Sequence, residues 1–320
     1  MRIATFMTNG SSRLGLILKG PSGAVCDLVT ATEFLQNGEA SKSGLPEDML
    51  ALVQARHEGG YERLESALSR IIEADSSSAY CLDRSRVKLC APLPHPGKII
   101  CLAGNYRDHI VESGYAAPPA SAIITPQLFL KPASAIIGDG DDIVISSNNH
   151  TVGWETELAV VIGKRGRNIQ AERAYDHVFG YTILNDVSER GLNSRIENRS
   201  KREMDGFFDW LAGKWFDGFA PSGPWIVTAD EIDDPHNLEI KLTVNGQIRQ
   251  QGNTREMIFR IPEQIAYISS IMTLQPGDII STGTPVGAGV GGDASLHDGD
   301  DLVCEIEGIG TLRNKVRAGN

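Results

Sequence analysis

Residues 154–162 read WETELAVVI, two glutamates followed by an almost unbroken apolar run. Such a run predicts a buried strand. Side chains two apart in a strand point to the same side, so Glu155 and Glu157 share one face, and Thr156 and Leu158 take the other. Two buried carboxylates repel unless a proton or a cation lies between them. A hard divalent ion such as Mg²⁺ meets this need, and solvated acids at an exposed strand end are the alternative.

A third acid strengthens the metal interpretation. Asp186 directly follows the mostly apolar run 178–185, VFGYTILN, at the point where a second expected strand breaks into a loop. Two glutamates and one aspartate at the ends of buried strands provide three oxygen ligands, which leaves positions for water or substrate. The sequence therefore predicts a metal site formed by Glu155, Glu157 and Asp186.

The rest of the chain beyond residue 97 is dominated by short Val-, Ile- and Thr-rich runs bounded by turn residues. Asn245-Gly246 between two extended runs predicts a type I′ hairpin. Helices are expected near 105–113, 171–177 and 261–273. Helices do not alternate regularly with strands, so the pattern favours a mainly β fold with a few helices (α+β) over a Rossmann fold or a TIM barrel.

The first 95 residues differ from the remainder and predict a small α+β domain. Two strands are expected at 2–7 and 14–20, followed by two helical patterns, around 49–53 and 64–72. The segment 91–97, APLPHPG, contains three prolines and is interpreted as a linker. The predicted division is therefore 1–95 and 96–320.

Composition excludes several classes of protein. The chain has 320 residues and a net charge of −11, which disfavours general binding of nucleic acid or anionic membranes. No apolar run approaches the ~18 residues of a membrane span, and no secretory leader is evident, so a cytoplasmic location is expected. The five cysteines are odd in number and lack CxxC spacing, and we expect them to be reduced.

Residues 287–292 satisfy the pattern GxGxxG. The dinucleotide interpretation requires a helix directly after the glycines, and the sequence that follows does not predict one. A glycine-rich loop near a site is the preferred interpretation.

A series of short motifs resembles the fumarylacetoacetate hydrolase superfamily over about 97–317. In order along the chain they are GNYRDH (104–109), FLKP (129–132), ETELAVVIG (155–163), GYTILND (180–186), GKWFDGFAPSGP (213–224), QGNT (251–254), TGTP (282–285) and EGIGTLRN (307–314). The resemblance implies a mixed β-sandwich roll as the catalytic domain, a homodimer, and Mg²⁺ or Mn²⁺ held by the three acids.

The resemblance also implies roles for further residues. His109 and Glu112 match a pair that positions and deprotonates a water, and their i,i+3 spacing independently favours contact on one helix face. Lys214 lies in an apolar stretch, where a buried lysine needs an anionic partner, and it matches a lysine that stabilises enolate charge. Substrate-binding positions follow from the matching motifs: Arg190, Gln251, Thr284 and Tyr106.

One segment departs from the pattern. Where members often read Ser-x-Arg-Asp-x-Gln, this chain has Gly191 and Asn193, so the resemblance does not carry over the identity of the substrate. The stretch 190–202 holds four arginines and a lysine against one glutamate, which predicts either a local positive patch for a carboxylate or a closing loop, or a solvated charged helix.

These residues together predict a divalent-metal-dependent hydrolase that cleaves a carbon–carbon bond in an acylpyruvate or 2,4-diketo acid. His109 activates water, and the metal and Lys214 hold the resulting enolate. The same site also suits a decarboxylase, an isomerase or a sugar-acid dehydratase. A non-catalytic protein that binds a metal or an oxo acid is the alternative from another class. The expected partner is a small anionic oxo acid.

Overall fold

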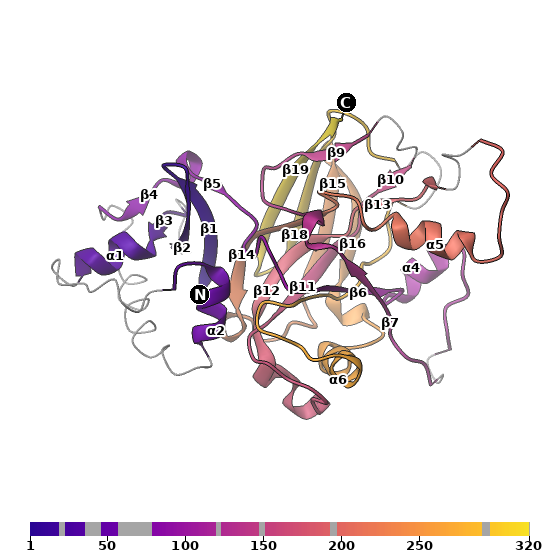
Figure 1. The fold of residues 1–320 in the computed structure, drawn as a ribbon, viewed down its shortest axis with the longest axis horizontal. Coiled ribbons are helices and arrows are strands. Elements are labelled where there is room, and N and C mark those ends of the chain that lie inside the picture. The colour runs from indigo at the N-terminus through magenta and orange to yellow at the C-terminus, as the bar shows by residue number, and fades with distance from the viewer. Residues whose placement is uncertain are drawn as a thin grey trace.

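The computed structural model describes residues 1–18, 23–35, 46–56, 79–119, 123–146, 151–192, 197–289 and 295–319. A 12-stranded sheet runs through the molecule (Figure 1). Its main path is β4 (Cys81–Leu82), β3 (Val25–Asp27), β2 (Ser11–Ile17), β1 (Arg2–Thr8), β14 (Ala220–Thr228), β12 (Val178–Asn185), β11 (Thr156–Ile162), β17 (Ile279–Ser281), β6 (Ile99–Ala103) and β7 (Gln127–Lys131). Beside this path, β5 (Lys88–Leu89) pairs with β1 and β8 (Ile136–Ile137) with β14.

A second, 5-stranded sheet packs against the large one. Its order is β16 (Gln247–Asn253), β15 (Glu239–Val244), β18 (Asp301–Ile306), β19 (Gly310–Ala318) and β9 (Ile143–Ile145). A short pair joins β10 (Val152–Gly153) to β13 (Ser188–Glu189). The mainly β architecture predicted from the sequence is confirmed.

The helices are short and lie around the sheets. They are α1 (Leu28–Leu35), α2 (Met49–Ala55), α4 (Arg107–Glu112), α5 (Asp205–Ala212) and α6 (Ile261–Ile271). Single 3₁₀ turns occur at η1 (Arg84–Arg86), η2 (Ala133–Ala135), η5 (Ala229–Glu231) and η6 (Thr254–Glu256), and a longer one at η3 (Ala171–His177). Among the described residues, no helix is long and apolar enough to cross a membrane.

Strand β11 shows how the two faces of the large sheet differ. Leu158 and Val160 belong to the core between the two sheets, whereas Ala159 and Val161 belong to a second core on the opposite face. All seven residues of β11 are buried. The residues before the strand continue the same alternation, which places Glu155 and Glu157 on the face turned away from the 5-stranded sheet.

Predicted helices and turns are largely found. Those expected near 105–113, 171–177 and 261–273 correspond to α4, η3 and α6, and the pattern around 49–53 corresponds to α2, which Asp48 caps by accepting from the Ala51 N–H at 2.8 Å. The Asn245-Gly246 hairpin is confirmed, with positive φ at both residues. The pattern at 64–72 lies outside the described residues.

Two helices were not predicted. The sequences of α1, LVTATEFL, and α5, DGFFDWLA, are rich in β-branched or aromatic residues, whose helix propensity is low. Tertiary packing therefore decides their conformation.

The amino-terminal strands are continuous with the large sheet. β1 is antiparallel to β14, with Arg2 opposite Val227 and Ile3 opposite Ile226. In Figure 1 this part forms the indigo end of the molecule, and its strands meet the rest at β14. The division at residue 95 stays a prediction.

The expectation that all five cysteines are reduced is wrong. Cys26 and Cys81 form a disulfide, because β3 and β4 pair in a register that sets these two residues directly opposite each other. A separation of 55 residues gives no sequence signal for such a pairing. Cys90, Cys101 and Cys304 are free thiols.

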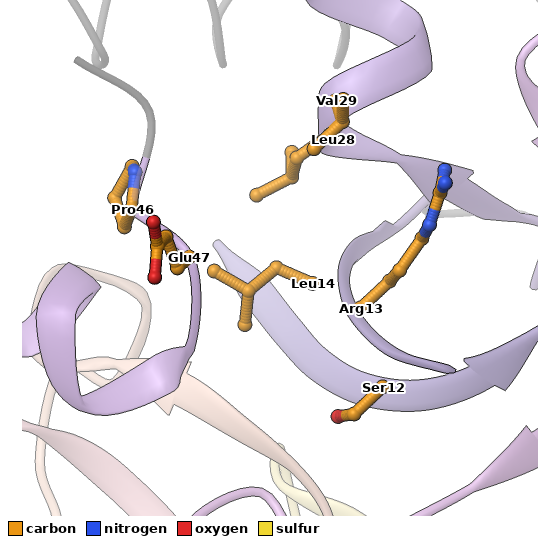
Figure 2. Close-up of a pocket in the computed structure, with 7 residues that line it drawn as sticks. All are labelled: Ser12, Arg13, Leu14, Leu28, Val29, Pro46 and Glu47. Carbon is orange, nitrogen blue, oxygen red and sulfur yellow. The ribbon is translucent and has the colours of Figure 1, made fainter. Parts of the chain in front are cut away.

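A cavity of about 240 Å³ lies in the amino-terminal part (Figure 2). It lies between β2, the start of α1 and the residues that precede α2, and its lining is Ser12, Arg13, Leu14, Leu28, Val29, Pro46 and Glu47. Arg13 is engaged in an ion pair with Asp27 at 2.9 Å. None of the predicted site residues lines this cavity.

His236 provides a test of the fold. Its Nε2 accepts the Ile261 N–H at 3.0 Å at the start of α6, and burial together with the charge of Arg260 lowers the pKa of His236 below its ordinary 6.5. The folded state therefore loses stability as the pH falls below 6.5 toward the folded-state pKa. We expect His236→Ala to lower the free energy of unfolding at pH 7.5 by about 1–3 kcal/mol, by orphaning the buried N–H.

The difference in the free energy of unfolding between the wild type and His236→Ala should shrink as the pH falls below 6.5. Denaturant unfolding at each pH measures this difference. His297→Ala, at an exposed histidine, is the control and should change neither quantity. A deficit for His236→Ala that grows toward low pH would contradict this account.

Candidate metal centre and active site

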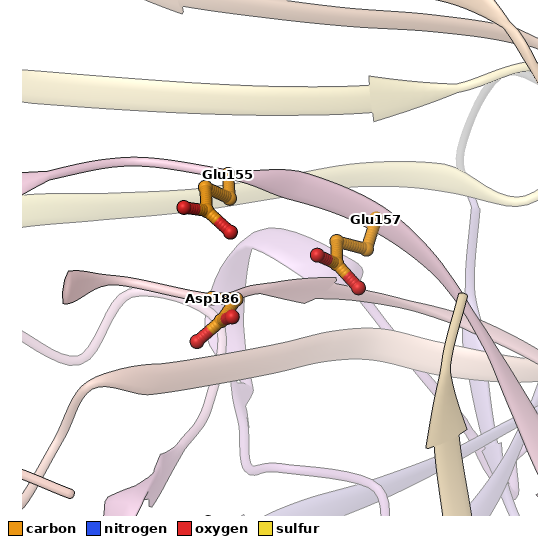
Figure 3. A group of neighbouring side chains, drawn as sticks. All are labelled: Glu155, Glu157 and Asp186. Atoms are coloured by element: carbon orange, nitrogen blue, oxygen red, sulfur yellow. The ribbon is translucent and has the colours of Figure 1, made fainter. Parts of the chain in front are cut away.

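Three buried carboxylates meet where β11 begins and β12 ends. Glu155, Glu157 and Asp186 each offer an oxygen, and these atoms all lie within 4.8 Å of one another. Figure 3 shows both glutamates on one side of their strand, with Asp186 facing them from the neighbouring strand. The antiparallel pairing of Thr156 with Asn185 creates this proximity, and the Asp186 N–H donates to the Glu155 carbonyl at 2.8 Å.

Neutral donors hold Glu157. Its Oε2 accepts from the hydroxyl of Ser281, the last residue of β17, at 2.6 Å and from the Gly283 N–H just beyond the strand at 2.8 Å. Burial and the charges of Asp186 and Glu155 raise the pKa of Glu157 well above its ordinary value. Within the described part of the chain, Glu157 is the one member of the triad with no cationic side chain in contact.

Lys214 is buried and bridges the other two acids. Its Nζ lies 3.0 Å from Glu155 Oε2 and 2.7 Å from Asp186 Oδ2, which confirms the expectation of an anionic partner. Burial alone would lower the pKa of Lys214, but the two carboxylates outweigh it and raise that pKa. The Phe129 and Trp210 rings flank the ammonium at 5.1 and 5.9 Å from their centroids.

Two further cations complete the surroundings. Lys131, at the end of β7, is fully buried at its side chain and contacts Asp186 Oδ1 at 2.5 Å and the Val187 carbonyl at 3.0 Å. Arg190 contacts Glu155 Oε1. Burial alone would raise the pKa of Glu155, but Lys214 and Arg190 outweigh it and hold that pKa below its ordinary value.

The donor set fits a hard divalent cation. Carboxylate oxygens are the ligands that Mg²⁺ and Mn²⁺ prefer, and three of them converge from two adjacent strands. Positive charge already compensates Glu155 and Asp186, whereas Glu157 has only neutral donors. A divalent ion would supply this missing compensation and would favour the ionised form of Glu157.

The predicted His109–Glu112 pair forms on α4. His109 Nδ1 lies 3.4 Å from Glu112 Oε2. His109 is buried, and it is close enough to Glu155 for its charge to help lower the pKa of that glutamate. The carboxylate of Glu112 also accepts the Gly287 N–H, at 3.1 and 3.0 Å to its two oxygens. The glycine-rich loop thus adjoins the candidate site, as expected, and no helix follows it at 295–300.

Tyr106, Thr284 and Gln251 lie in different surroundings. Among the described residues, the buried hydroxyl of Tyr106 finds no hydrogen-bond partner, and burial, followed by the charges of Glu157 and Glu256, raises the pKa of this phenol. Thr284 donates to the Thr156 carbonyl at 2.9 Å. Gln251 is exposed on β16. Their roles as substrate-binding residues stay predictions.

The basic stretch 190–202 is partly neutralised by acids that follow it in the sequence. Arg199 lies 2.7 Å from Asp209 and 3.1 Å from Asp205, and Arg202 lies 2.9 Å from Asp205. These pairs fasten the segment to α5, whereas Arg190 turns to Glu155. Residues 193–196 lie outside the described part of the chain.

Sequence reasoning missed several members of the site. Lys131 belongs to the quoted FLKP motif, but it received no role. A charged residue at the end of an alternating strand, directly before Pro132, was the available signal. Ser281 and Gly283 were missed because only the parallel pairing of β17 with β6, and its antiparallel pairing with β11, bring them to Glu157.

The fold is a mixed β-sandwich roll that holds a candidate metal centre, an arrangement typical of an enzyme. Solved structures of enzymes share this architecture over the full length of the chain. Maleylpyruvate hydrolase from Sphingobium sp. SYK-6, in a complex with manganese(II) and pyruvate, has a TM-score of 0.73 and 33% identity, covering 100% of both chains. The 2-hydroxyhepta-2,4-diene-1,7-dioate isomerase from Mycobacterium marinum has a TM-score of 0.69 and 28% identity, covering 100% of this chain and 99% of the other.

The chain belongs to the fumarylacetoacetate hydrolase family. The family model described as "Fumarylacetoacetate (FAA) hydrolase C-terminal" matches residues 98–317. A mitochondrial oxaloacetate tautomerase from Xenopus laevis is 43% identical over 254 residues, which are 79% of this chain and 75% of that relative.

Removing one carboxylate should abolish metal binding. We expect Asp186→Asn to lose measurable Mn²⁺ binding in isothermal titration, because it deletes a charged ligand from a set of three. Asp278→Asn is the control, since Asp278 is equally buried but pairs with Lys98 at 2.7 Å outside the triad. Unchanged Mn²⁺ affinity in Asp186→Asn would contradict the ligand assignment.

Lys131 should stabilise the metal-free protein. Lys131→Met leaves the Asp186 carboxylate with one cation fewer, and breaking a buried pair in this way costs about 3–5 kcal/mol. Added Mn²⁺ should restore part of this loss, so the metal-induced rise in Tm should be larger than in the wild type.

Lys98→Met is the control, because it removes the lysine paired with Asp278, a buried carboxylate away from the triad. It should destabilise the protein without any additional rescue by Mn²⁺. Equal metal-induced rises in Tm for Lys131→Met, Lys98→Met and the wild type would contradict this role of Lys131.

Proposed function

We propose that this protein catalyses a divalent-metal-dependent keto–enol interconversion of a 2-oxo dicarboxylic acid of the oxaloacetate class. The observation that carries the proposal is Lys214, a buried ammonium held between Glu155 and Asp186 beside the candidate metal position. Negative charge that develops on an oxo-acid oxygen there meets a preorganised cation in surroundings that exclude water. The similarity to the Xenopus laevis tautomerase supports this choice of substrate class.

Charge balance also supports a dianionic substrate. The three carboxylates of the triad are matched in number by three cations, Lys131, Lys214 and Arg190, which contact Glu155 and Asp186. A divalent ion would leave a net positive site, which matches the two carboxylates of an oxaloacetate-like molecule. Arg190 is suited to one of them because a guanidinium presents a planar fork to a carboxylate.

When bound, a divalent cation supplies electrostatic stabilisation for negative charge on the substrate oxygens. His109 carries the proton. Its Nδ1 faces Glu112, so Nε2 is the nitrogen left to accept a proton from the carbon next to the keto group. That C–H bond breaks, its electron pair forms the carbon–carbon double bond, and the keto oxygen takes the negative charge. Lys214 stabilises this oxygen until the protonated His109, directly or through water, returns a proton to it and so completes the enol.

Hydrolysis of an acylpyruvate is the second candidate. The His109–Glu112 pair favours it, because the same Nε2 can take a proton from water that attacks a distal carbonyl. The structural similarity to maleylpyruvate hydrolase also supports it. The two reactions share Lys214 and His109 and differ in whether a carbon–carbon bond breaks.

Product analysis in deuterated water separates these reactions. With Mg²⁺ or Mn²⁺, we expect enol oxaloacetate absorbance to decay faster than the uncatalysed rate, with deuterium entering next to the keto group and no fragment formed. His109→Gln should slow this by about 10²-fold or more, a typical loss for a general base.

An acylpyruvate in the same assay provides the contrast. Cleavage of the acylpyruvate without acceleration of the oxaloacetate tautomers would overturn the first proposal in favour of hydrolysis. Release of CO₂ from oxaloacetate would identify a decarboxylase. Asp186→Asn serves as the control and should be inactive in each assay.

A further inference from the structure

The glycine-rich loop 286–289 lies between two elements of the candidate site. On one side it contacts Glu112 of α4, and on the other it contacts Trp154, the residue directly before Glu155. These contacts connect the start of the metal-binding strand with the His109–Glu112 pair.

Trp154 holds the loop by two hydrogen bonds. Its indole Nε1–H donates to the Gly287 carbonyl at 3.0 Å, and its own carbonyl accepts from the Gly289 N–H at 3.3 Å. The Trp154 side chain is 3% exposed, so the indole has a fixed position. The loop is therefore fixed on both sides of Ala288.

The loop has little freedom to move away. A Cβ on Gly287 would lie 2.0 Å from the Arg249 carbonyl oxygen, and its φ is +89°. A Cβ on Gly153 would lie 2.1 Å from the Gly289 carbonyl oxygen. Both positions thus require glycine, because backbone from β16 and from β10 approaches the loop too closely for any side chain.

Glu112 depends on this loop for its orientation. It is the last residue of a six-residue helix, and its side chain is 25% exposed. The Gly287 N–H bonds both of its oxygens, and the other partner found for this carboxylate among the described residues is His109. Without the N–H, the long side chain would sample solvent-facing rotamers.

We propose that Trp154 and Gly287 are positioning residues that hold the Glu112 carboxylate against His109. The chain of hydrogen bonds runs from the Trp154 indole to the Gly287 carbonyl, and from the Gly287 N–H to Glu112 and His109. The proposal rests on the proposed function, in which His109 carries the proton. It adds that the strand segment carrying Glu155 and Glu157 and the proton carrier are aligned through this loop.

Trp154→Phe tests this link, because it removes the indole N–H and keeps an aromatic side chain. The ring proton and nitrogen resonances of His109, identified by their loss in His109→Gln, should shift by more than a linewidth at fixed pH. The kcat should fall about tenfold with little change in KM, a typical loss for an outer partner of a site residue.

Two variants separate positioning from general damage. Trp225→Phe is the matched control, since it removes an indole N–H that donates to the Ile309 carbonyl at 2.7 Å and leaves the loop intact. It should leave the His109 resonances and kcat unchanged. In a Glu112→Ala background, Trp154→Phe should have no further effect on either quantity, because the link is already broken.

If Trp154→Phe fails to fold, 3-benzothienylalanine at position 154 keeps the shape of the indole without its N–H. His109 resonances that stay unchanged in the folded variant would overturn the proposal, even if kcat falls. The two proposals can fail separately. If the wild-type protein turns over no oxo acid but Trp154→Phe still shifts the His109 resonances, the positioning role of Trp154 is supported and only the proposed function is overturned.

Discussion

Burial of three acids in a shared space is the constraint on which the rest of the site depends. Glu155, Glu157 and Asp186 are each at most 5% exposed, and unscreened carboxylates at this separation cannot all stay ionised without cations. Lys131 and Lys214 meet that demand on one side, and a divalent ion is suited to meet it on the other. The need to balance the three carboxylates explains why two lysines are buried at this place.

The sheet architecture creates this arrangement from residues distant in the sequence. Pairing of β11 with β12 brings Asp186 to Glu155, and pairing of β11 with β17 brings Ser281 to Glu157. The second sheet covers the other face, so the carboxylates lie on a rigid scaffold. Short loops and α4 then add Gly287, His109 and Glu112 beside the triad, which matches the usual division between a rigid scaffold and the residues that carry function.

Features that depend on residues close together in the sequence could be predicted from the sequence. The alternation of Glu155 and Glu157, the turn at Asn245-Gly246 and the need of Lys214 for an anionic partner could all be predicted from neighbouring residues. The Cys26–Cys81 disulfide, the contact of Ser281 with Glu157 and the contact of Gly287 with Glu112 could not, because each depends on which strands and loops become neighbours. Helix α5 was missed because packing overrides its low propensity.

The whole site depends on one assignment, that the three carboxylates bind a single divalent metal ion. An anomalous-scattering crystal structure of the protein soaked with Mn²⁺ tests it most directly. One strong anomalous peak is expected among Glu155, Glu157 and Asp186, within bonding distance of an oxygen from each. A soaked crystal with Mn²⁺ bound elsewhere, and with Lys131, Lys214 and Arg190 still compensating the triad, would contradict this assignment.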